Sequence, residues 1–127
     1  MKAFLISTTD EPGVAGRLLE ATAARGVNVT QAYGLADGRN ALMVLGSEDE
    51  SGLEAAIADA GKTATPIEMF VTELENKPGS GAALFRKLAD AGVNLRVAVP
   101  IGMSGDRTQI ALGAADPEPL RRALAAE

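Results

Sequence analysis

The feature that most constrains the fold of this 127-residue chain is an internal repeat. Residues 4–32 align without a gap on residues 70–98, at an offset of 66 positions (70 − 4). From Leu45, which matches Leu112, the offset is 67 (112 − 45), and we place this one-residue change at a turn between two strands. Self-similarity of this kind predicts two copies of one structural unit packed in tandem.

The first unit is expected to span residues 1–66, and its first half predicts a strand, a helix and a strand. Phe4 to Thr8 is a short apolar-rich strand, and alternating residues from Val27 to Tyr33 predict the second strand. Gly26 is expected to end the intervening helix in a left-handed conformation. Three apolar-face residues at helical spacing predict its buried side: Leu18, Leu19 and Thr22, matched by Leu84, Phe85 and Leu88.

The second half of the unit predicts a hairpin, a helix and a last strand. Asp37-Gly38 favours a turn into a third strand over Ala41 to Leu45. Ser47 to Glu50 resembles the start of a capped helix. Lys62 to Thr65 completes the unit as a fourth strand, and Pro66 is expected to separate it from the next unit.

These elements give the order β-α-β-β-α-β in an α+β fold: two tandem ferredoxin-like units, each an antiparallel sheet with both helices on one face. The second unit, residues 67–127, has no residues for the last strand after its second helix. An unpaired sheet edge invites pairing with another strand. We therefore expect a homodimer or pairing between units.

Composition excludes several functional classes. The chain has no cysteine and no histidine, so disulfides, thiolate or imidazole metal sites and a histidine base are excluded. A net charge of −5 opposes binding to nucleic acid and to anionic membranes. No apolar run is long enough for a signal or a membrane span, no cofactor motif is present, and a cytoplasmic non-enzyme is expected.

A repeated loop carries the residues suited to binding. An acid or amide followed by Pro-Gly stands at the first strand-to-helix turn, and a Gly-Val-Asn sequence follows the helix. Helix-start amides and a glycine backbone favour a carboxylate, Asp10 favours an ammonium, and asparagine amides donate and accept. The candidate ligand-binding residues are Asp10, Gly13, Val14, Asn28, Asn76, Gly79, Ser80 and Asn94. We expect Asn28 and Asn94 to lie beside the loops of their own units. The residues of each unit would then hold both the ammonium and the carboxylate of an amino acid.

The motif Asp/Asn-x-Pro-Gly, then a helix and Gly-Val-Asn, resembles the ACT family of amino-acid-binding regulatory domains. Asn76-Lys77-Pro78-Gly79 with Asn94 is similar to the serine-binding domain of phosphoglycerate dehydrogenase, in which the asparagines matching Asn76 and Asn94 contact the effector. The histidine used there is replaced by Leu74 here. The resemblance covers nearly the whole chain and implies a stand-alone tandem ACT protein, with ligands held where the loop of one unit faces its neighbour.

Several alternatives stand beside this reading. Pro-Gly alone is an ordinary turn, and Asn28 and Asn94 have the chemistry to hydrogen-bond a neighbouring loop. The leading hypothesis is a regulatory sensor for an amino acid or similar metabolite, with a metabolic enzyme as a partner. The alternative is a protein-interaction module or regulatory subunit that binds no ligand. RNA binding shares the strand order, but it requires exposed strand aromatics and a basic face.

Overall fold

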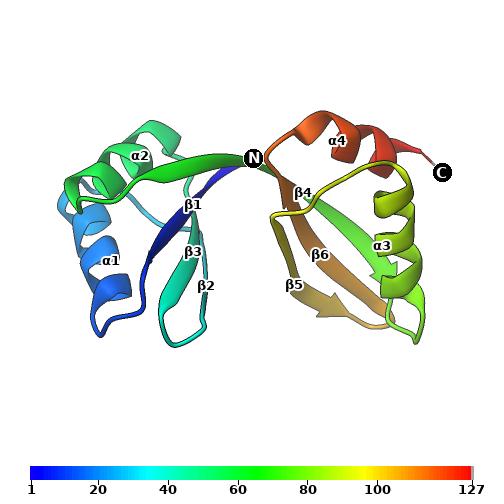
Figure 1. The fold of residues 1–127 in the computed structure, drawn as a ribbon. Helices are drawn as coiled ribbons and strands as arrows, with labels where there is room; N and C mark the ends of the chain where they lie inside the picture. The colour runs from blue at the N-terminus through cyan, green and yellow to red at the C-terminus, as the bar shows by residue number, and fades with distance from the viewer. Residues whose placement is uncertain (127) are drawn as a thin grey trace. The chain divides into compact units, whose positions relative to one another are not determined.

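A computed structural model describes residues 1–126, which form two units by their internal contacts: residues 2–66, and residues 67–126 together with Met1. The first unit contains β1 (Lys2–Thr9), α1 (Val14–Ala24), β2 (Gln31–Ala36), β3 (Asn40–Gly46) and α2 (Glu50–Asp59) (Figure 1). The second contains α3 (Ser80–Asp90), β5 (Val97–Ser104), β6 (Arg107–Ala114) and α4 (Pro117–Ala125). Between them, β4 (Ala64–Glu75) supplies three residues to the first unit and the first strand of the second.

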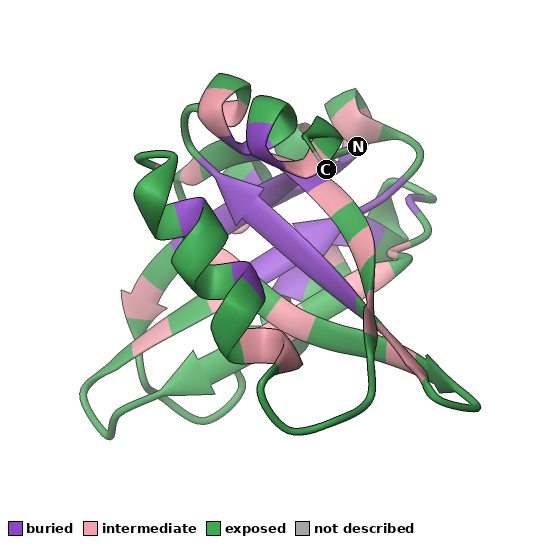
Figure 2. Ribbon diagram, turned by 90° about the vertical axis from the view of Figure 1, so that its right-hand side faces the viewer, coloured by how far each residue is buried: buried purple, intermediate pink, exposed green. Residues whose placement is uncertain are grey.

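The two units have the same strand arrangement. The antiparallel order is β2-β3-β1 in the first unit and β5-β6-β4 in the second, with both helices of each unit on one face (Figure 1). In the second unit, the outward sides of the helices are exposed and buried residues line the side toward the strands (Figure 2). The predicted α+β order is confirmed for the described residues.

The first unit is built around a cluster in which both helices pack on β1 and β3. Its buried members are Phe4, Ile6, Val14, Leu18, Val27, Leu45, Leu53 and Ile57. The corresponding cluster of the second unit contains Leu84, Leu88, Ile110, Leu112, Ala114, Leu120 and Ala123. Leu19 and Phe85, which we expected on the buried helix faces, are each 41% exposed. Residues i and i+1 lie 100° apart around a helix, so Val14, Leu18 and Thr22 form the buried stripe instead.

Helix and turn signals were predicted well. Gly26 and Gly92 follow α1 and α3 with φ of 69° and 76°, the left-handed conformation expected of a residue that ends a helix. Asp116 caps α4 by accepting a hydrogen bond from the Glu118 amide. The capping box expected to open at Ser47 was wrong. Asp49 caps α2 by accepting a hydrogen bond from the Gly52 amide, and the Ser47 hydroxyl instead donates to the Asn28 carbonyl at 2.7 Å.

Three boundary predictions were wrong. The second strand, expected over Val27 to Tyr33, is β2 over Gln31–Ala36. Pro66 does not separate two strands, because β4 runs through it without interruption. Proline is compatible with an extended backbone where its nitrogen need not donate a ladder hydrogen bond. The change of offset also does not occur at the hairpin turn: Gly34 and Pro100 still differ by 66 (100 − 34), whereas Leu35 and Gly102 differ by 67 (102 − 35). The extra residue is Ile101, a β-bulge within β5.

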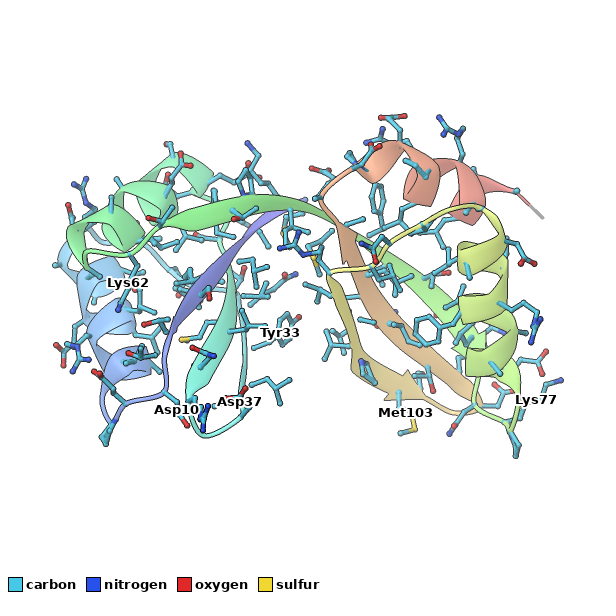
Figure 3. The ribbon with its side chains drawn as sticks, viewed as in Figure 1. Asp10, Tyr33, Asp37, Lys62, Lys77 and Met103 are labelled. Carbon is cyan, nitrogen blue, oxygen red and sulfur yellow. The ribbon has the colours of Figure 1, made fainter. Side chains whose placement is uncertain are left out.

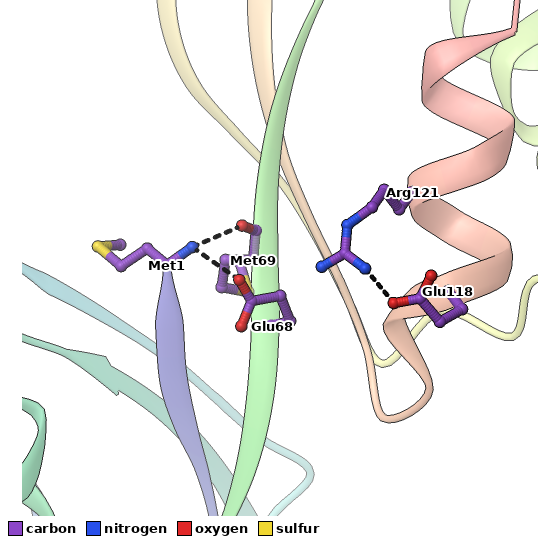
Figure 4. A network of polar contacts seen from close by, with 5 residues as sticks. All are labelled: Met1, Glu68, Met69, Glu118 and Arg121. Atoms are coloured by element: carbon purple, nitrogen blue, oxygen red, sulfur yellow. Dashed lines mark hydrogen bonds and ion pairs between the residues drawn. The ribbon is translucent and has the colours of Figure 1, made fainter.

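Met1 belongs to the second unit. Its amino group donates to Glu68 Oε1 and to the Met69 carbonyl, both at 3.2 Å, and both acceptors belong to β4 (Figure 4). On α4, Arg121 pairs with Glu118 and its guanidinium lies 5.5 Å from the centroid of the Phe70 ring. A guanidinium at that distance from an aromatic ring is favourably placed for a cation–π contact.

Candidate functional site

The loop from β1 to α1 leaves helix-start amides without partners. Gly13, the N-cap of α1, has φ 86°, and no side chain caps the helix. The Val14 amide makes a long 3.4 Å bond to the Glu11 carbonyl, and the Arg17 amide bonds the Gly13 carbonyl. Within residues 1–126, the amides of Ala15 and Gly16 have no acceptor. Such amides, with the positive end of the helix dipole, favour a carboxylate.

A cavity of about 280 Å³ opens beside this helix start. Its walls are the end of β1 with the loop, the first turn of α1, and the neighbouring parts of β2 and β3. The lining residues are Thr9, Asp10, Glu11, Val14, Ala15, Gly34, Leu35, Ala36, Ala41, Leu42 and Met43. The space exists because Gly34, Ala36 and Ala41 carry almost no side chain opposite α1. At about 30 Å³ per water, it has room for a small metabolite.

The rim of this cavity is acidic. Asp10 and Glu11 are exposed, and neither carboxylate makes an ion pair or hydrogen bond within residues 1–126. Asp37 lies at the same end of the unit (Figure 3), but its Oδ1 already accepts the amides of Asn40 and Arg39 at 2.8 Å. These bonds lower the pKa of Asp37, that from Asn40 most strongly. Asp10 and Glu11 are therefore the carboxylates left to meet a cation.

The corresponding loop of the second unit is built differently. Asn76, the counterpart of Asp10, donates from Nδ2 to the Met103 sulfur at 3.3 Å, and its backbone amide bonds the Asp106 carbonyl. Met103 stands where the first unit has Ala36 (103 − 36 = 67), and both Met103 and Lys77 lie at the loop end of the unit (Figure 3). Lys77 replaces Glu11 and pairs with Glu75 at 2.9 Å. This pairing is the main cause of the lowered pKa of Glu75, with a smaller contribution from Arg107.

The structure does not bring the predicted asparagines to these loops within a unit. Thr9 pairs with Asn40 at the loop end of the first unit, whereas Thr30 bonds the Gly46 carbonyl at the other end. Asn28, just before Thr30, is therefore roughly 20 Å from Asp10, the length of six strand residues. The same holds for Asn94 and Asn76. We expected the asparagine beside the loop, but α1 and α3 return the chain to the opposite end of the strands before β2 and β5 begin.

The remaining candidates are divided between two surfaces. Gly79 is the left-handed N-cap of α3, with φ 92°, and Ser80 lines a groove between α3 and β4. Asn94 lines a separate hollow of about 210 Å³ with Arg96 and Asp116. Of the eight predicted residues, Asp10 and Val14 therefore share the first-unit cavity, and Gly13 begins the adjoining helix.

Sequence reasoning missed the far wall of the cavity. Gly34, Ala36 and Ala41 were treated as ordinary strand residues, yet their small size creates the space. The available signal was alternation: Ala32, Gly34 and Ala36 place three small residues on one face of β2.

The described residues place two limits on the chemistry. None of the helices in residues 1–126 is long and apolar enough to cross a membrane. The same residues contain no group of three or more histidine, cysteine, aspartate or glutamate side chains placed to hold a metal ion. The site therefore rests on its carboxylates, amides and apolar walls.

Comparison with known proteins shows similarity in structure. No family model and no curated protein sequence matches the chain. Protein BT0572 from Bacteroides thetaiotaomicron superimposes with a TM-score of 0.73 at 14% identity, over 98% of this chain and 85% of that one. The ligand-free regulatory subunit of aspartate kinase from Thermus thermophilus gives 0.59 at 23% identity, over 98% and 87%.

A whole aspartate kinase, from Clostridium acetobutylicum, gives a TM-score of 0.67 at 14% identity, with 97% of this chain covering 31% of the enzyme. The similarity to aspartate kinase therefore includes a separate regulatory subunit and part of a larger enzyme. At these identities the comparison shows the fold. The resemblance to ACT-type regulatory domains is confirmed at that level, and the chain has the fold of the regulatory subunits of aspartate kinase.

Proposed function

We propose that the protein is a non-enzymatic regulatory protein whose first unit binds a free amino acid with a small aliphatic side chain. The observation that carries this proposal is the first-unit cavity, which has unpaired carboxylates and helix-start amides at its edge and apolar walls within. The similarity in fold to regulatory subunits of aspartate kinase supports a regulatory role.

The cavity matches the three parts of such a ligand. Asp10 and Glu11 would attract the ammonium group, and no cationic residue lines the cavity to repel it. The free amides of Ala15 and Gly16 would donate hydrogen bonds to the carboxylate. Val14 and Met43 would pack against an aliphatic side chain, and the volume of about 280 Å³ suits a side chain of a few carbons.

Regulation requires that the ligand bind two states of the protein with different affinity. The cavity spans the first turn of α1 and the β2–β3 hairpin, so a ligand there would hold these elements together. We propose that this constraint is passed to a partner enzyme or to a second copy of the chain. We also propose that the chain forms a homodimer.

The second candidate is an interaction module without a ligand. It is favoured by exposed apolar side chains, since Leu35 is 77% and Met103 71% exposed. Both are at the hairpin ends, and Leu35 also lines the cavity. RNA binding is disfavoured because Phe4 and Phe70 pack in or against the core clusters, which leaves Tyr33 on the helix-free side of an edge strand (Figure 3).

The test is a thermal-shift screen of the full chain against the twenty amino acids, with Ala36→Met as the main variant. A ligand that binds only the folded state stabilises it by about 2.7 kcal/mol at a hundred times its Kd. We expect stabilisation by aliphatic amino acids. It should be lost in Ala36→Met, which gives the first unit the side chain that its counterpart Met103 provides in the second.

Met103→Ala is the matched control and should leave the response unchanged. Replacing Asp10 and Glu11 by Asn and Gln should weaken binding about tenfold or more, because a charge-assisted hydrogen bond contributes about 1.5–3 kcal/mol. A flat response at millimolar ligand, or full binding by Ala36→Met, would reject the cavity. Loss of binding in Asn28→Ala would instead show that an asparagine reaches the ligand from another unit or another copy.

A further inference from the structure

The outer edge of β2 is open in the first unit. β2 ends the strand order β2-β3-β1 and, among residues 1–126, pairs only with β3. The Asp37 amide bonds the Asn40 carbonyl at 3.1 Å, so every second residue counted back from Asp37 hydrogen-bonds β3. The residues between them have N–H and C=O groups that point away from β3 and make no hydrogen bond within residues 1–126: Ala32, Gly34 and Ala36.

The equivalent edge of the second unit is blocked. Pro100 in β5 is the counterpart of Gly34 (100 − 34 = 66) and has no N–H to donate. The bulge at Ile101 follows it and shifts the register. Prolines and bulges keep an edge strand from pairing with another chain. β2 has no proline, no charged residue and no bulge over Gln31–Ala36, so the first unit keeps open an edge that the second unit closes.

This open edge is continuous with the first-unit cavity. Gly34 and Ala36, whose backbone groups point outward, also line the cavity, and Asp10 lines it from the end of β1. Because β3 lies between β1 and β2, the cavity spans about 10 Å from the Asp10 loop to the edge. About three extended residues cover that distance, and the edge from Ala36 back to Ala32 pairs with about five more.

The charges along this path favour a cation at its inner end. The carboxylates of Asp10 and Glu11 have no ion pair within residues 1–126, and no lysine or arginine lines the cavity. Asp37 and Arg39, on the hairpin turn, do not line it either, and Asp37 already accepts two backbone amides. The α-ammonium group of a polypeptide supplies such a cation at its first residue, followed by an uncharged backbone that can pair with β2.

We propose that the first unit binds the free amino terminus of a partner protein, with its first residues in the cavity and the next residues added as a strand to β2. This inference rests on the cavity of the proposed function and extends its ligand from a free amino acid to a protein terminus. Asp10 and Glu11 hold the ammonium, and the amides of Ala15 and Gly16 donate to the carbonyl oxygen of the first residue. The segment starts at the end of the unit where β2 finishes, so it runs antiparallel to β2.

Strand geometry also limits the sequence of this segment. Side chains opposite Tyr33 and Leu35 lie beside them on the helix-free face, because successive side chains of a strand alternate between faces. Leu35 is 77% exposed, so an apolar residue opposite it gains contact. The partner therefore has an unacetylated amino terminus that begins with small residues and continues as a strand with alternate apolar residues.

The probe is the octapeptide Ala-Ala-Ser-Val-Thr-Val-Thr-Ser, amidated at its carboxyl end and titrated into the ¹⁵N-labelled full chain. Binding should slow the hydrogen exchange of the amides of Ala32, Gly34 and Ala36, whereas those of Tyr33 and Leu35 are already bonded to β3. The N-acetylated peptide should bind about tenfold or more weakly, because it lacks the charge-assisted hydrogen bonds of the ammonium. Two peptides N-methylated at residues 4 and 6 or at residues 5 and 7 should differ as strongly, since only every second amide of an added strand faces β2.

Ala32→Pro is the variant that separates the edge from the cavity. Ala32 is exposed, does not line the cavity and does not use its N–H to pair with β3. The variant should therefore keep the native spectrum and the binding of free L-valine, while its affinity for the octapeptide falls about tenfold or more through lost backbone hydrogen bonds. Ala36→Met, which fills the cavity, should lose both ligands.

Equal binding of the free and acetylated peptides, or of the two N-methylated peptides, would overturn the inference. So would full peptide binding by Ala32→Pro, or sedimentation showing that a second copy covers β2 and the peptide does not displace it. Valine binding without peptide binding would overturn it and leave the proposed function intact. Peptide binding without valine binding would support it and reject a free amino acid as the ligand.

Discussion

The two units of this chain have the same backbone arrangement but different side chains at equivalent positions. Gly13 and Gly79 begin the first helix of each unit with nearly the same left-handed φ, 86° and 92°. The side chains around them differ: Val14, buried in the first unit, corresponds to Ser80, and the core residue Ile6 corresponds to the half-buried Thr72. The first unit therefore has a closed core beside a small cavity, and the second unit has an open groove on the same backbone arrangement.

The contrast extends through the two hydrophobic cores. Phe4 is 2% exposed, whereas its counterpart Phe70 is half-buried and packs at the margin of the second cluster. Ile57 is 1% exposed, and its counterpart Leu124 is half-buried beside the groove. Because burial of apolar area supplies most of the stabilisation of a small unit, the second unit should be the less stable one.

The largest expected effect comes from truncating this matched pair. Ile57→Ala should lower the free energy of unfolding by about 2–5 kcal/mol, the usual range for a fully buried aliphatic side chain that leaves a cavity. Leu124→Ala should cost roughly half as much, because Leu124 is already partly in contact with water. Urea denaturation of both variants measures the difference, and hydrogen exchange of each unit shows where it acts.

The comparison would fail if Leu124→Ala cost as much as Ile57→Ala. That result would mean that Leu124 is covered in solution, for example by an occupant of the groove.

A smaller loss of stability is expected from substituting the left-handed glycine that begins the first helix of each unit. Gly13→Ala and Gly79→Ala should each destabilise the chain by about 1–2 kcal/mol, since a side chain in the left-handed region is strained. An added Cβ at Gly13 would lie 3.1 Å from Arg17 Nη1, a flexible end that moves away easily, and nothing lies within 4 Å at Gly79. The two costs should therefore be similar when measured by urea denaturation.

Gly16→Ala and Gly81→Ala are the controls for this pair. Both positions are within the first turn of a helix, and a Cβ at either meets nothing within 4 Å. Alanine there should be neutral or stabilise by up to about 1 kcal/mol. A loss of stability in the controls would show that the first turns are not helical in solution.

Repetition made much of the fold predictable from sequence. Each unit supplied an independent reading of the same elements, so the helix-ending glycines and the aspartate cap of α4 were identified correctly. The position of the extra residue was not predictable, because Ile101 is an apolar strand residue like its neighbours and only the pairing register reveals the bulge. Leu19 and Phe85 were misplaced because two adjacent apolar residues do not say which one faces the strands.

The candidate site was predictable only in part, for a geometric reason. The loop residue Asp10 and the buried Val14 are close in sequence, so their proximity follows from the turn itself. The distance between Asn28 and the Asp10 loop depends on the length and direction of α1, which local sequence does not specify. The cavity wall of Gly34, Ala36 and Ala41 depends on strand pairing, and small residues carry no chemical signal of their own.

The smallest effect on stability should come from the ion pair between Arg25 and Asp59, which the second unit lacks at the equivalent positions. Arg25 donates to both carboxylate oxygens of Asp59, at 2.5 and 3.1 Å, and ties the end of α1 to the end of α2. The counterparts in the second unit are Ala91 and Ala126 (91 − 25 = 66 and 126 − 59 = 67). The hydrogen bond from Arg25, with its positive charge, holds the pKa of Asp59 below its ordinary value of 3.8.

A carboxyl group whose pKa is lower in the folded state stabilises the fold above its ordinary pKa. That contribution is lost as the pH falls through the folded value. Asp59→Asn should therefore cost little at pH 7, because the pair is exposed, and should flatten the pH dependence of stability below about pH 4. Carboxyl NMR titration of Asp59 and urea denaturation of both proteins at low and neutral pH measure this. A titration midpoint at or above 3.8, or an unchanged slope in the variant, would show that the ion pair does not distinguish the units in solution.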